Sequence, residues 1–590
     1  MGLKVNSVLQ TLPKIGHRVL HVADENVNLN SAPHGEEKLE KAPEHKIGRG
    51  IYGQNSYPVT ETTDSELWEW RKKIEKIAKE EGLDPFDVIF WVFNPELLMQ
   101  TAARGGFPVQ IRHWKNGMEF YELSTQQKFN LMRIFEMVIN NDPCHAYLLE
   151  GNQLCDQKLV ICHVMGHSDF FKNNIYFSKT NRNMLNRIAE HAASVKNILD
   201  SQTVTYEEVE QFLEKAYSIE NLVDTTRIEP RELKFSVPHM KDVEKLPDNW
   251  GVVDVSKFPQ HIQKRFNDPE RIEEERKAEE KRREEELKQL PREPERDVIG
   301  FLIEHSQALK PWQRHILGMI REQSYYFVPQ RLTKIMNEGW AKYWDQKLMI
   351  HPEVQDLRHT TEIALHNGRG LAMGMQLNPY KIGFEIFKNI EERWNKGRHG
   401  PEWEALEERE ERRKFDTKEM KGKEKIFEVR RDYKDTDFIR AFLTEEVAKE
   451  LKLFVWGPEE EETSEDGSAL VIKSRDVNEI KRRLIELIEN GGEPIIQIVD
   501  GNFENRGELL LEHVHTFDLK PDYREETLKN LRALWGRPVH LKTMRTTEEG
   551  KKERIRISVD DDGDVDETPL DKKEVSTGYP MDPCGGPFIG

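Results

Sequence analysis

The sequence predicts a mainly α-helical N-terminal and central domain followed by a small α+β C-terminal domain. Between residues 63 and 400, apolar side chains recur mainly at three- and four-residue steps, the period of an amphipathic helix. After residue 430, short apolar runs of the β type alternate with helical patterns and turn signals. Because the chain has 590 residues, it is long enough to form two or three hydrophobic cores.

We expect an extended or disordered arm over residues 1–62, where the sequence is polar and contains several Gly, Pro and Asn residues. The mainly helical domain is predicted to begin at residue 63. Asp64 or Ser65 is the expected cap of its first helix, which runs through Ile74. We place the end of this domain at residue 400.

Two charged segments interrupt the chain. Residues 268–296 contain an almost unbroken run of Glu, Arg, Lys and Ala, which predicts a solvated helix held by ion pairs four residues apart. A helix that binds a partner is the alternative, although the run lacks the apolar stripe that a coiled coil requires. Residues 401–430 are charged again and are predicted to be a linker.

The predicted C-terminal α+β domain covers residues 431–545. Its β-type runs lie at 453–456, 469–472, 495–499, 509–515 and 539–542, and its helical patterns at 438–450, 477–490 and 525–535. Residues 546–590 are predicted to be an acidic, disordered tail. They do not fit a calcium-binding loop, because Ser558 and Pro569 would stand at its first and twelfth positions, where carboxylates are needed.

Composition and charge argue against several classes of function. The 88 basic and 107 acidic residues give a net charge of −19. The sequence has no extended basic patch, so we do not expect nucleic-acid binding. No apolar stretch is long enough to cross a bilayer, so we do not expect an integral membrane protein. The sequence contains no glycine-rich phosphate-binding loop, so we do not expect a nucleotide cofactor. The four cysteines are too scattered for a disulfide framework, which is typical of a soluble protein in a reducing compartment.

The segment 163–167 (HVMGH) is the first candidate site. On a helix, His163 and His167 project from the same face, at the spacing that a metal ion needs. A zinc peptidase of the H-E-x-x-H type would carry its general base at position 164, where this chain has Val164. Glu190 and His191 on the next helical stretch are further candidate ligands. Alternatively, the two histidines are core residues that bond to buried carboxylates or carbonyl groups.

The second candidate is Glu338 in the segment 337–343 (NEGWAKY). This segment resembles the one that supplies the glutamate zinc ligand in the aminopeptidase branch of the gluzincins. Together with the two histidines, Glu338 would complete the layout of a catalytic zinc ion with an open position. Glu322 would then be the candidate general base. Alternatively, Glu338 is buried and paired with Arg331 or Lys334.

Several segments together resemble the SpoVR family, stage V sporulation protein R, in order from about residue 64 to 545. They are 163–173 (HVMGHSDFFKN), 336–341 (MNEGWA), 378–383 (NPYKIG), 438–444 (FIRAFLT), 506–513 (RGELLLEH) and 534–541 (LWGRPVHL). One position departs from the family pattern, since Asp345 stands where a histidine is usual. Because Asp can also bind a metal, Asp345 is a further candidate ligand.

The resemblance implies a cytoplasmic bacterial protein with a role in assembling spore cortex or cell-envelope peptidoglycan, or in the stress response. It also implies a PrkA-type serine kinase and a von Willebrand A-like protein as partners. We therefore expect a regulatory or assembly protein with a buried His/Glu site for zinc or another divalent metal. The alternative is a zinc-dependent, gluzincin-type hydrolase of a peptide or peptidoglycan-precursor amide. A purely structural protein with ion-paired core histidines is the third possibility.

Overall fold

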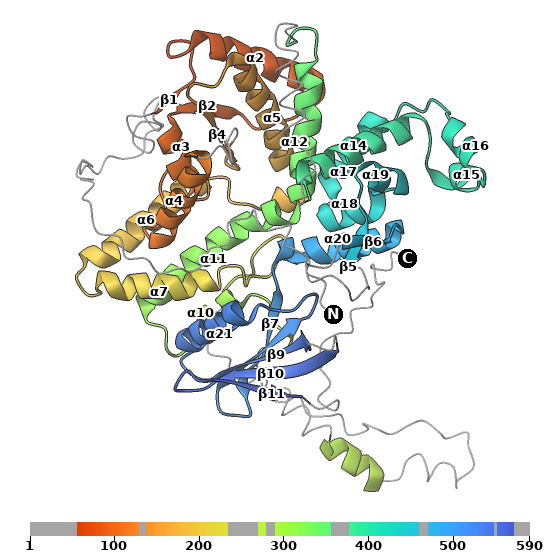
Figure 1. The fold of residues 1–590 in the computed structure, drawn as a ribbon. Coiled ribbons are helices and arrows are strands. Elements are labelled where there is room, and N and C mark those ends of the chain that lie inside the picture. The colour runs from red at the N-terminus through yellow and green to blue at the C-terminus, as the bar shows by residue number, and fades with distance from the viewer. Residues whose placement is uncertain are drawn as a thin grey trace, which may run out of the picture. The chain divides into compact units, whose positions relative to one another are not determined.

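The fold comes from a computed structural model, which describes residues 56–128, 137–233, 270–278, 290–355, 377–458, 470–547 and 551–570. The chain divides into two compact units (Figure 1). Among the described residues, the helical unit consists of those within 56–210 and 325–492, and the sheet unit of those within 211–324 and 493–570. A mainly helical region followed by a C-terminal sheet confirms the predicted fold class.

Side-chain caps begin two of the main helices of the helical unit. Asp64 accepts a hydrogen bond from the Leu67 backbone N–H at 3.1 Å, and Asn378 accepts one from the Lys381 N–H at 3.2 Å. The helices of this unit are α2 (Ser65–Glu80), α3 (Pro95–Ala102), α4 (Trp114–Lys128), α5 (Leu154–Asn173), α6 (Met184–Asp200), α12 (Lys334–Met349), α14 (Pro379–Asn395), α15 (Gly400–Glu404), α16 (Arg409–Lys414), α17 (Gly422–Asp432), α18 (Asp435–Phe442), α19 (Glu445–Glu450) and α20 (Val477–Ile488). Two others, α7 (Tyr206–Ser218) and α11 (Pro311–Leu332), cross the division between the units.

Three strands of a four-stranded sheet lie within the region that the sequence predicts to be helical. Its order is β1 (Ser56–Pro58), β2 (Val88–Phe93), β4 (Cys144–Leu149) and β3 (Met137–Ile139), with β2 and β4 parallel. β2 is the apolar run VIFWVF, in which almost every residue is buried. Because every residue of such a run is apolar, its hydrophobic periodicity cannot distinguish a buried strand from a buried helix. β1 lies in the predicted N-terminal arm, whereas residues 1–55 of that arm lie outside the described residues.

The segment 401–492 forms part of the helical unit, so the domain boundaries differ from the predicted ones. The predicted linker contains α15, α16 and most of α17. Ile426 and Val429 of α17 are fully buried in the same hydrophobic core as α5 and α12, as are Phe438 of α18 and Leu451, which follows α19. A narrow apolar stripe thus packs α17 against the core, although the charged composition of this segment predicts a linker. β5 (Val455–Pro458) and β6 (Leu470–Ser474) form a separate two-stranded sheet.

The sheet unit contains a five-stranded sheet of order β11-β10-β9-β8-β7. β8 and β9 are parallel, α21 connects them, and the other pairs are antiparallel. The elements are α10 (Val298–His305), β7 (Ile495–Phe503), β8 (Glu508–Val514), α21 (Pro521–Trp535), β9 (Val539–Thr546), β10 (Lys552–Val559) and β11 (Val565–Pro569).

β10 and β11 occupy part of the tail that the sequence predicts to be disordered. Ile555, Ile557 and Val559 alternate with polar residues and are fully buried, which is the pattern of a strand with one face on a core. The acidic residues at 560–564 form the turn between the two strands rather than a tail. Residues 571–590 lie outside the described residues.

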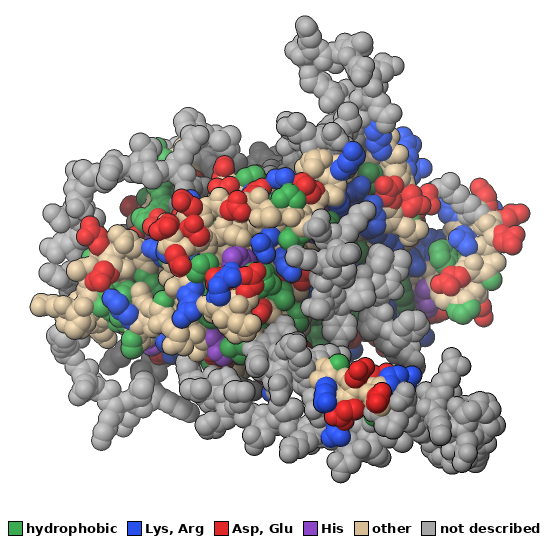
Figure 2. Space-filling view, turned by 90° about the horizontal axis from the view of Figure 1, so that it is seen from below, with side chains coloured by type: hydrophobic (Ala, Val, Ile, Leu, Met, Phe, Trp, Pro, Cys, Tyr) green, Lys and Arg blue, Asp and Glu red, His purple; other side chains and the backbone are tan. Residues whose placement is uncertain are grey.

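The charged segment 268–296 is described only in part. Residues 270–278 are helical and largely exposed, and Arg271 pairs with Glu275 at 3.3 Å, as a solvated helix requires. Acidic and basic side chains also intermingle over the face that Figure 2 shows. Within the part of the chain that the structure describes, no helix has both the length and the apolar character to span a membrane.

Candidate metal centre

Two helices of the helical unit, α5 and α12, carry the centre and lie side by side (Figure 1). Glycines allow this close contact, since a Cβ added at Gly166 of α5 would lie 2.7 Å from the Ala341 Cα of α12. On its other side, α12 contacts α14 just as closely, because a Cβ at Gly339 would lie 2.4 Å from the Gly383 backbone. The backbones of α5, α12 and α14 can therefore approach closely at these glycines.

α5 places His163 and His167 one turn apart, facing α12. Their ring centroids are 4.6 Å apart and the rings are close to perpendicular, at 76°. Only 2% of His163 and 4% of His167 is exposed. Two imidazoles buried this completely need polar partners close by.

Glu338 of α12 supplies one of these partners. Its Oε2 atom lies 3.3 Å from the Nε2 of His167 and 3.7 Å from the Nε2 of His163. One ligand atom from each of the three residues lies within 4.8 Å of the others. Ligands about 2.0–2.2 Å from a zinc ion at tetrahedral angles are about 3.3–3.6 Å apart. The spacing between Glu338 and the two histidines therefore fits a shared metal ion.

The second nitrogen of each imidazole is held by α12. His163 Nδ1 lies 2.9 Å from the Oδ2 of Asp345, and His167 Nδ1 lies 2.9 Å from the Oδ1 of Asn337. Because these oxygens can only accept, each Nδ1 carries the proton and donates it. In the neutral imidazole this leaves the Nε2 lone pair available on the side of Glu338, as in the carboxylate–histidine–metal arrangement of known sites.

The Glu338 carboxylate is buried, ionised and directed at the histidines. Burial alone would raise its pKa, but the charge of Lys334 and the neighbouring imidazoles of His167 and His163 hold that pKa well below its usual value. Its Oε1 accepts a hydrogen bond from the Lys334 ammonium. Its Oε2 is buried and has no hydrogen-bond partner within the described residues. A buried carboxylate oxygen beside two imidazole nitrogens is a suitable metal ligand.

The N-terminus of α12 is held by a carboxylate from another helix. Thr333, at the cap position, makes no side-chain capping bond. Asp435 of α18 instead accepts hydrogen bonds from the backbone N–H groups of Ile335 and Met336, both at 2.8 Å. This contact fixes the turn that precedes Asn337 and Glu338.

Comparison with known proteins places the chain in a family. The family model described as "SpoVR like protein" matches residues 61–493, and the one described as "SpoVR-like C-terminal domain" matches residues 494–546. The chain belongs to the SpoVR family. It is similar to the "Uncharacterized protein YcgB" of Escherichia coli (strain K12), with 27% identity over 488 residues, which cover 80% of this chain and 90% of that protein. No solved structure matches the chain.

The two SpoVR family models meet where the structure changes units. The first ends at residue 493, and the final part of the sheet unit begins at Glu493. All three residues of the candidate centre lie in the segment that the first SpoVR model matches.

The structure groups only some of the predicted site residues of this SpoVR chain. Asp345 accepts a hydrogen bond from the Nδ1 of His163 and is not one of the three residues whose ligand atoms converge. Of the two alternatives for Glu338, its partner is Lys334. Asn337 is the partner that the sequence analysis missed, although it stands directly before Glu338 in the SpoVR segment NEGWA.

The remaining predicted residues lie outside this group. Glu190 is exposed on α6 and pairs with Arg187 at 2.6 Å, and His191 is buried on the same helix. Glu322 is half-buried on α11, in the part of that helix assigned to the sheet unit. Its role as a base therefore stays a prediction. Within the described residues, the only group of three or more potential ligands is His163, His167 and Glu338.

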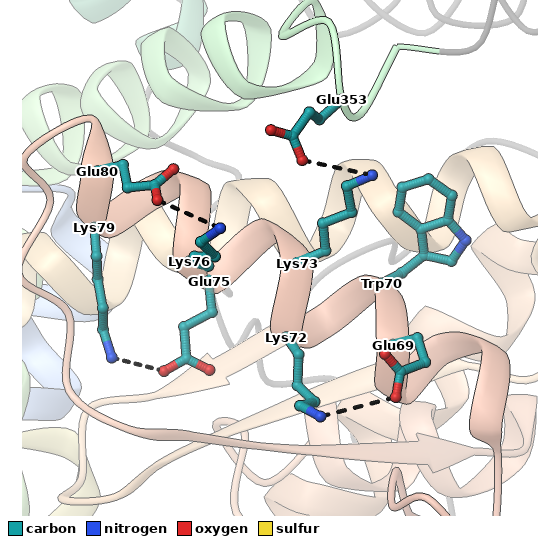
Figure 3. A pocket seen from close by; sticks show the side chains of 9 residues that line it. All are labelled: Glu69, Trp70, Lys72, Lys73, Glu75, Lys76, Lys79, Glu80 and Glu353. Carbon is teal, nitrogen blue, oxygen red and sulfur yellow. Dashed lines mark hydrogen bonds and ion pairs between the residues drawn. The ribbon is translucent and has the colours of Figure 1, made fainter.

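The pocket in Figure 3 lies along α2 and contains none of these residues. It has a volume of about 990 Å³ and is lined by Trp70 and by equal numbers of lysine and glutamate side chains. Each lysine is paired with a glutamate, for example Lys73 with Glu353 at 3.7 Å and Lys79 with Glu75 at 2.8 Å. Because its charges are balanced within the pocket, it indicates no particular ligand.

Proposed function

We propose that this SpoVR-family protein holds a divalent transition metal, zinc or a related ion, between α5 and α12. His163, His167 and Glu338 are the proposed ligands. The observation that carries the proposal is the arrangement of the nitrogens, since both Nε2 atoms face one carboxylate oxygen while Asp345 and Asn337 hold both Nδ1 atoms. Three protein ligands leave a fourth position open.

Metal analysis of purified protein tests this proposal. Protein prepared without chelators should contain about one metal ion per chain. His163→Ala and Glu338→Gln should lose that ion, whereas the matched control His315→Ala, at an exposed position on α11, should keep it. Circular dichroism would verify that each variant is folded. If folded wild-type protein binds no transition metal in stoichiometric amount, the proposal fails.

The cellular role that we propose is regulatory or one of assembly. The SpoVR resemblance supports a cytoplasmic protein that acts in forming spore cortex or cell-envelope peptidoglycan, or in the stress response. It also supports a PrkA-type serine kinase and a von Willebrand A-like protein as partners. The fully buried Val164 supports a role other than peptidase chemistry, because the usual general base is missing from that position.

A genetic experiment separates this role from a purely structural one. Replacing the chromosomal gene with His163→Ala should reproduce the envelope or stress phenotype of a deletion, while the protein accumulates to its normal level. A variant that is abundant and fully functional would show that the metal centre is not needed for the cellular role. Affinity purification of the wild-type protein tests the proposed kinase and von Willebrand A-like partners.

A zinc-dependent hydrolase is the second candidate function. Two histidines and one carboxylate with an open position are the ligand set of many catalytic zinc sites, and this observation favours it. Glu322→Gln should then abolish hydrolysis of a peptide or peptidoglycan-precursor amide without loss of metal. Metal-loaded protein that shows no hydrolysis would contradict the hydrolase function, and equal hydrolysis by Glu322→Gln would contradict the assignment of Glu322 as the base.

A further inference from the structure

The charges around the centre point to the kind of ligand that occupies its open position. We infer that the centre takes an oxyanion, a carboxylate or phosphate group, and that Lys334 is the residue that selects it. This inference rests on the proposed metal centre. It names the chemistry of the exchangeable ligand, which the three proposed protein ligands alone do not determine.

The first step is a charge balance over the side chains that surround the ligand atoms. Glu338 is paired with Lys334, and Asp345 is paired with the Nζ of Lys342 at 3.2 Å. Each carboxylate is thus neutralised by its own lysine. Each imidazole keeps its proton on Nδ1, which donates a hydrogen bond to a side chain of α12, and its Nε2 would bind the metal. The two histidines are therefore neutral in the metal-bound centre.

A divalent cation would therefore add two positive charges, and a further carboxylate that acts on Lys334 and Glu338, that of Asp435, could offset at most one of them. The cost of burying such charge is high, because the ligand side chains are between 2% and 6% exposed. A negatively charged fourth ligand removes part of this cost, whereas an amide or an amine does not. The balance consequently favours an oxyanion.

The second step concerns the position of Lys334. Its side chain is 44% exposed, while that of Glu338, its partner, is 6% exposed. Lys334 therefore contacts both the buried Glu338 carboxylate and the solvent. We place the solvent-accessible side of the centre at Lys334. Lys342 is only 4% exposed and serves Asp345 in the interior. A cation at the accessible edge attracts anions and can bind an oxyanion as a point charge.

Cobalt substitution allows the inference to be tested without an activity assay. The visible absorption of bound Co²⁺ changes when a new ligand enters its coordination sphere. Co²⁺-loaded protein would be titrated with acetate, with inorganic phosphate and with acetamide as the neutral control, at an ionic strength held constant with perchlorate. We expect saturable changes with acetate or phosphate and none with acetamide. The tighter of the two anions identifies a carboxylate or a phosphate source.

Variants on α12 test the role of Lys334. Lys334→Met should keep Co²⁺ and bind the anion about tenfold more weakly, since a bond to a charged group is lost. Lys334→Arg should retain most of the affinity. The matched control is Lys347→Met, because Lys347 lies on the same helix and pairs with Glu391 at 2.7 Å, away from the centre.

The outcomes separate this inference from the proposal beneath it. Failure of the wild-type protein to bind Co²⁺ would overturn the metal centre itself. Co²⁺ binding with no response to either anion, or with an equal response to acetamide, would overturn the oxyanion and leave the centre standing. Equal anion affinity in wild type and Lys334→Met would overturn the assignment of Lys334.

Discussion

At the scale of single residues, the geometry of the candidate centre depends on what holds the histidines in place. An imidazole can rotate and can carry its proton on either nitrogen, so two histidines at the correct spacing do not by themselves form a site. Asp345 and Asn337 remove this freedom by accepting the Nδ1 protons from the same helix that carries Glu338. One helix thus supplies a ligand and orients both of the others.

We predict that Asp345→Ala, which removes the acceptor of the His163 Nδ1 proton, weakens metal binding about 10- to 100-fold, the usual effect of losing a hydrogen-bond partner of a metal-binding histidine. Competition with a chromophoric chelator would measure the affinity. Asn337→Asp is the matched control, because it keeps an acceptor oxygen opposite His167 and should retain most of the affinity. Unchanged affinity in Asp345→Ala would show that Asp345 does not act through His163.

At the scale of secondary structure, the centre depends on how closely α12 approaches its neighbours. The glycine at position 339 removes the side chain that would otherwise keep α12 away from α14. The Asp435 carboxylate fixes the first turn of α12 from outside the helix. Both features belong to packing between helices and are independent of helix propensity.

We predict that Gly339→Ala destabilises the helical unit by about 1–3 kcal/mol, because the new Cβ would lie 2.4 Å from the Gly383 backbone and the helices would have to separate. It should also reduce metal content. Gly117→Ala on α4 is the control, since no atom outside that helix's own backbone lies within 4 Å of the added Cβ. That change should be neutral or stabilise the unit by up to about 1 kcal/mol. Urea unfolding would compare the two variants.

The Asp435 carboxylate should make stability depend on pH. Burial raises its pKa to about 7, although its bonds to the Ile335 and Met336 backbone act in the opposite direction. The folded-state pKa therefore lies above the unfolded value of about 3.9. The folded protein binds the proton more tightly, so this contribution to stability is fully present below pH of about 4 and is lost as the pH rises through about 7.

Asp435→Asn tests this dependence in metal-free protein. The stability of wild type relative to the variant should fall as the pH is raised from about 4 to about 7, as measured by urea unfolding at several pH values. The charged neighbours Lys334 and Glu338 are the same in both proteins. A difference that does not vary with pH would contradict a raised pKa at Asp435.

At the scale of the whole molecule, the candidate centre belongs to one of the two units. All residues of the candidate centre lie in the helical unit. The sheet unit is built from two distant segments of the chain, and its β10 and β11 come after the end of the region that the SpoVR C-terminal model matches. A change in the sheet unit therefore alters none of the residues of the candidate centre.

We predict that a chain ending at Thr547 loses stability in the sheet unit and keeps metal binding in the helical unit. The truncation removes Ile555, Ile557 and Val559, each fully buried and each contributing about 1.5–3 kcal/mol through burial. Calorimetry and metal analysis would follow the two units separately. Unfolding identical to that of the full chain would show that β10 and β11 do not stabilise the sheet unit.

Local patterns were sufficient for the fold class and for the choice of His163, His167 and Glu338. Helical periodicity and the spacing of two histidines are properties of neighbouring residues, and the resemblance of segment 337–343 to a gluzincin segment supplied the glutamate. Patterns failed where burial contradicts composition. The charged run that contains Ile426 and the acidic region around β10 both look solvated, yet each buries a narrow set of apolar residues.

The amino-acid sequence by itself determined the family, the two kinds of structure and the residue types of the candidate centre, because each of these is written in short segments. Only the tertiary structure decided that Glu338 meets His163 and His167, that Asp345 supports a histidine instead of joining the ligands, and that Asp435 caps α12. These contacts join residues about 100 to 180 positions apart. Such distances are set by the packing of whole helices, on which spacing along the chain carries no information.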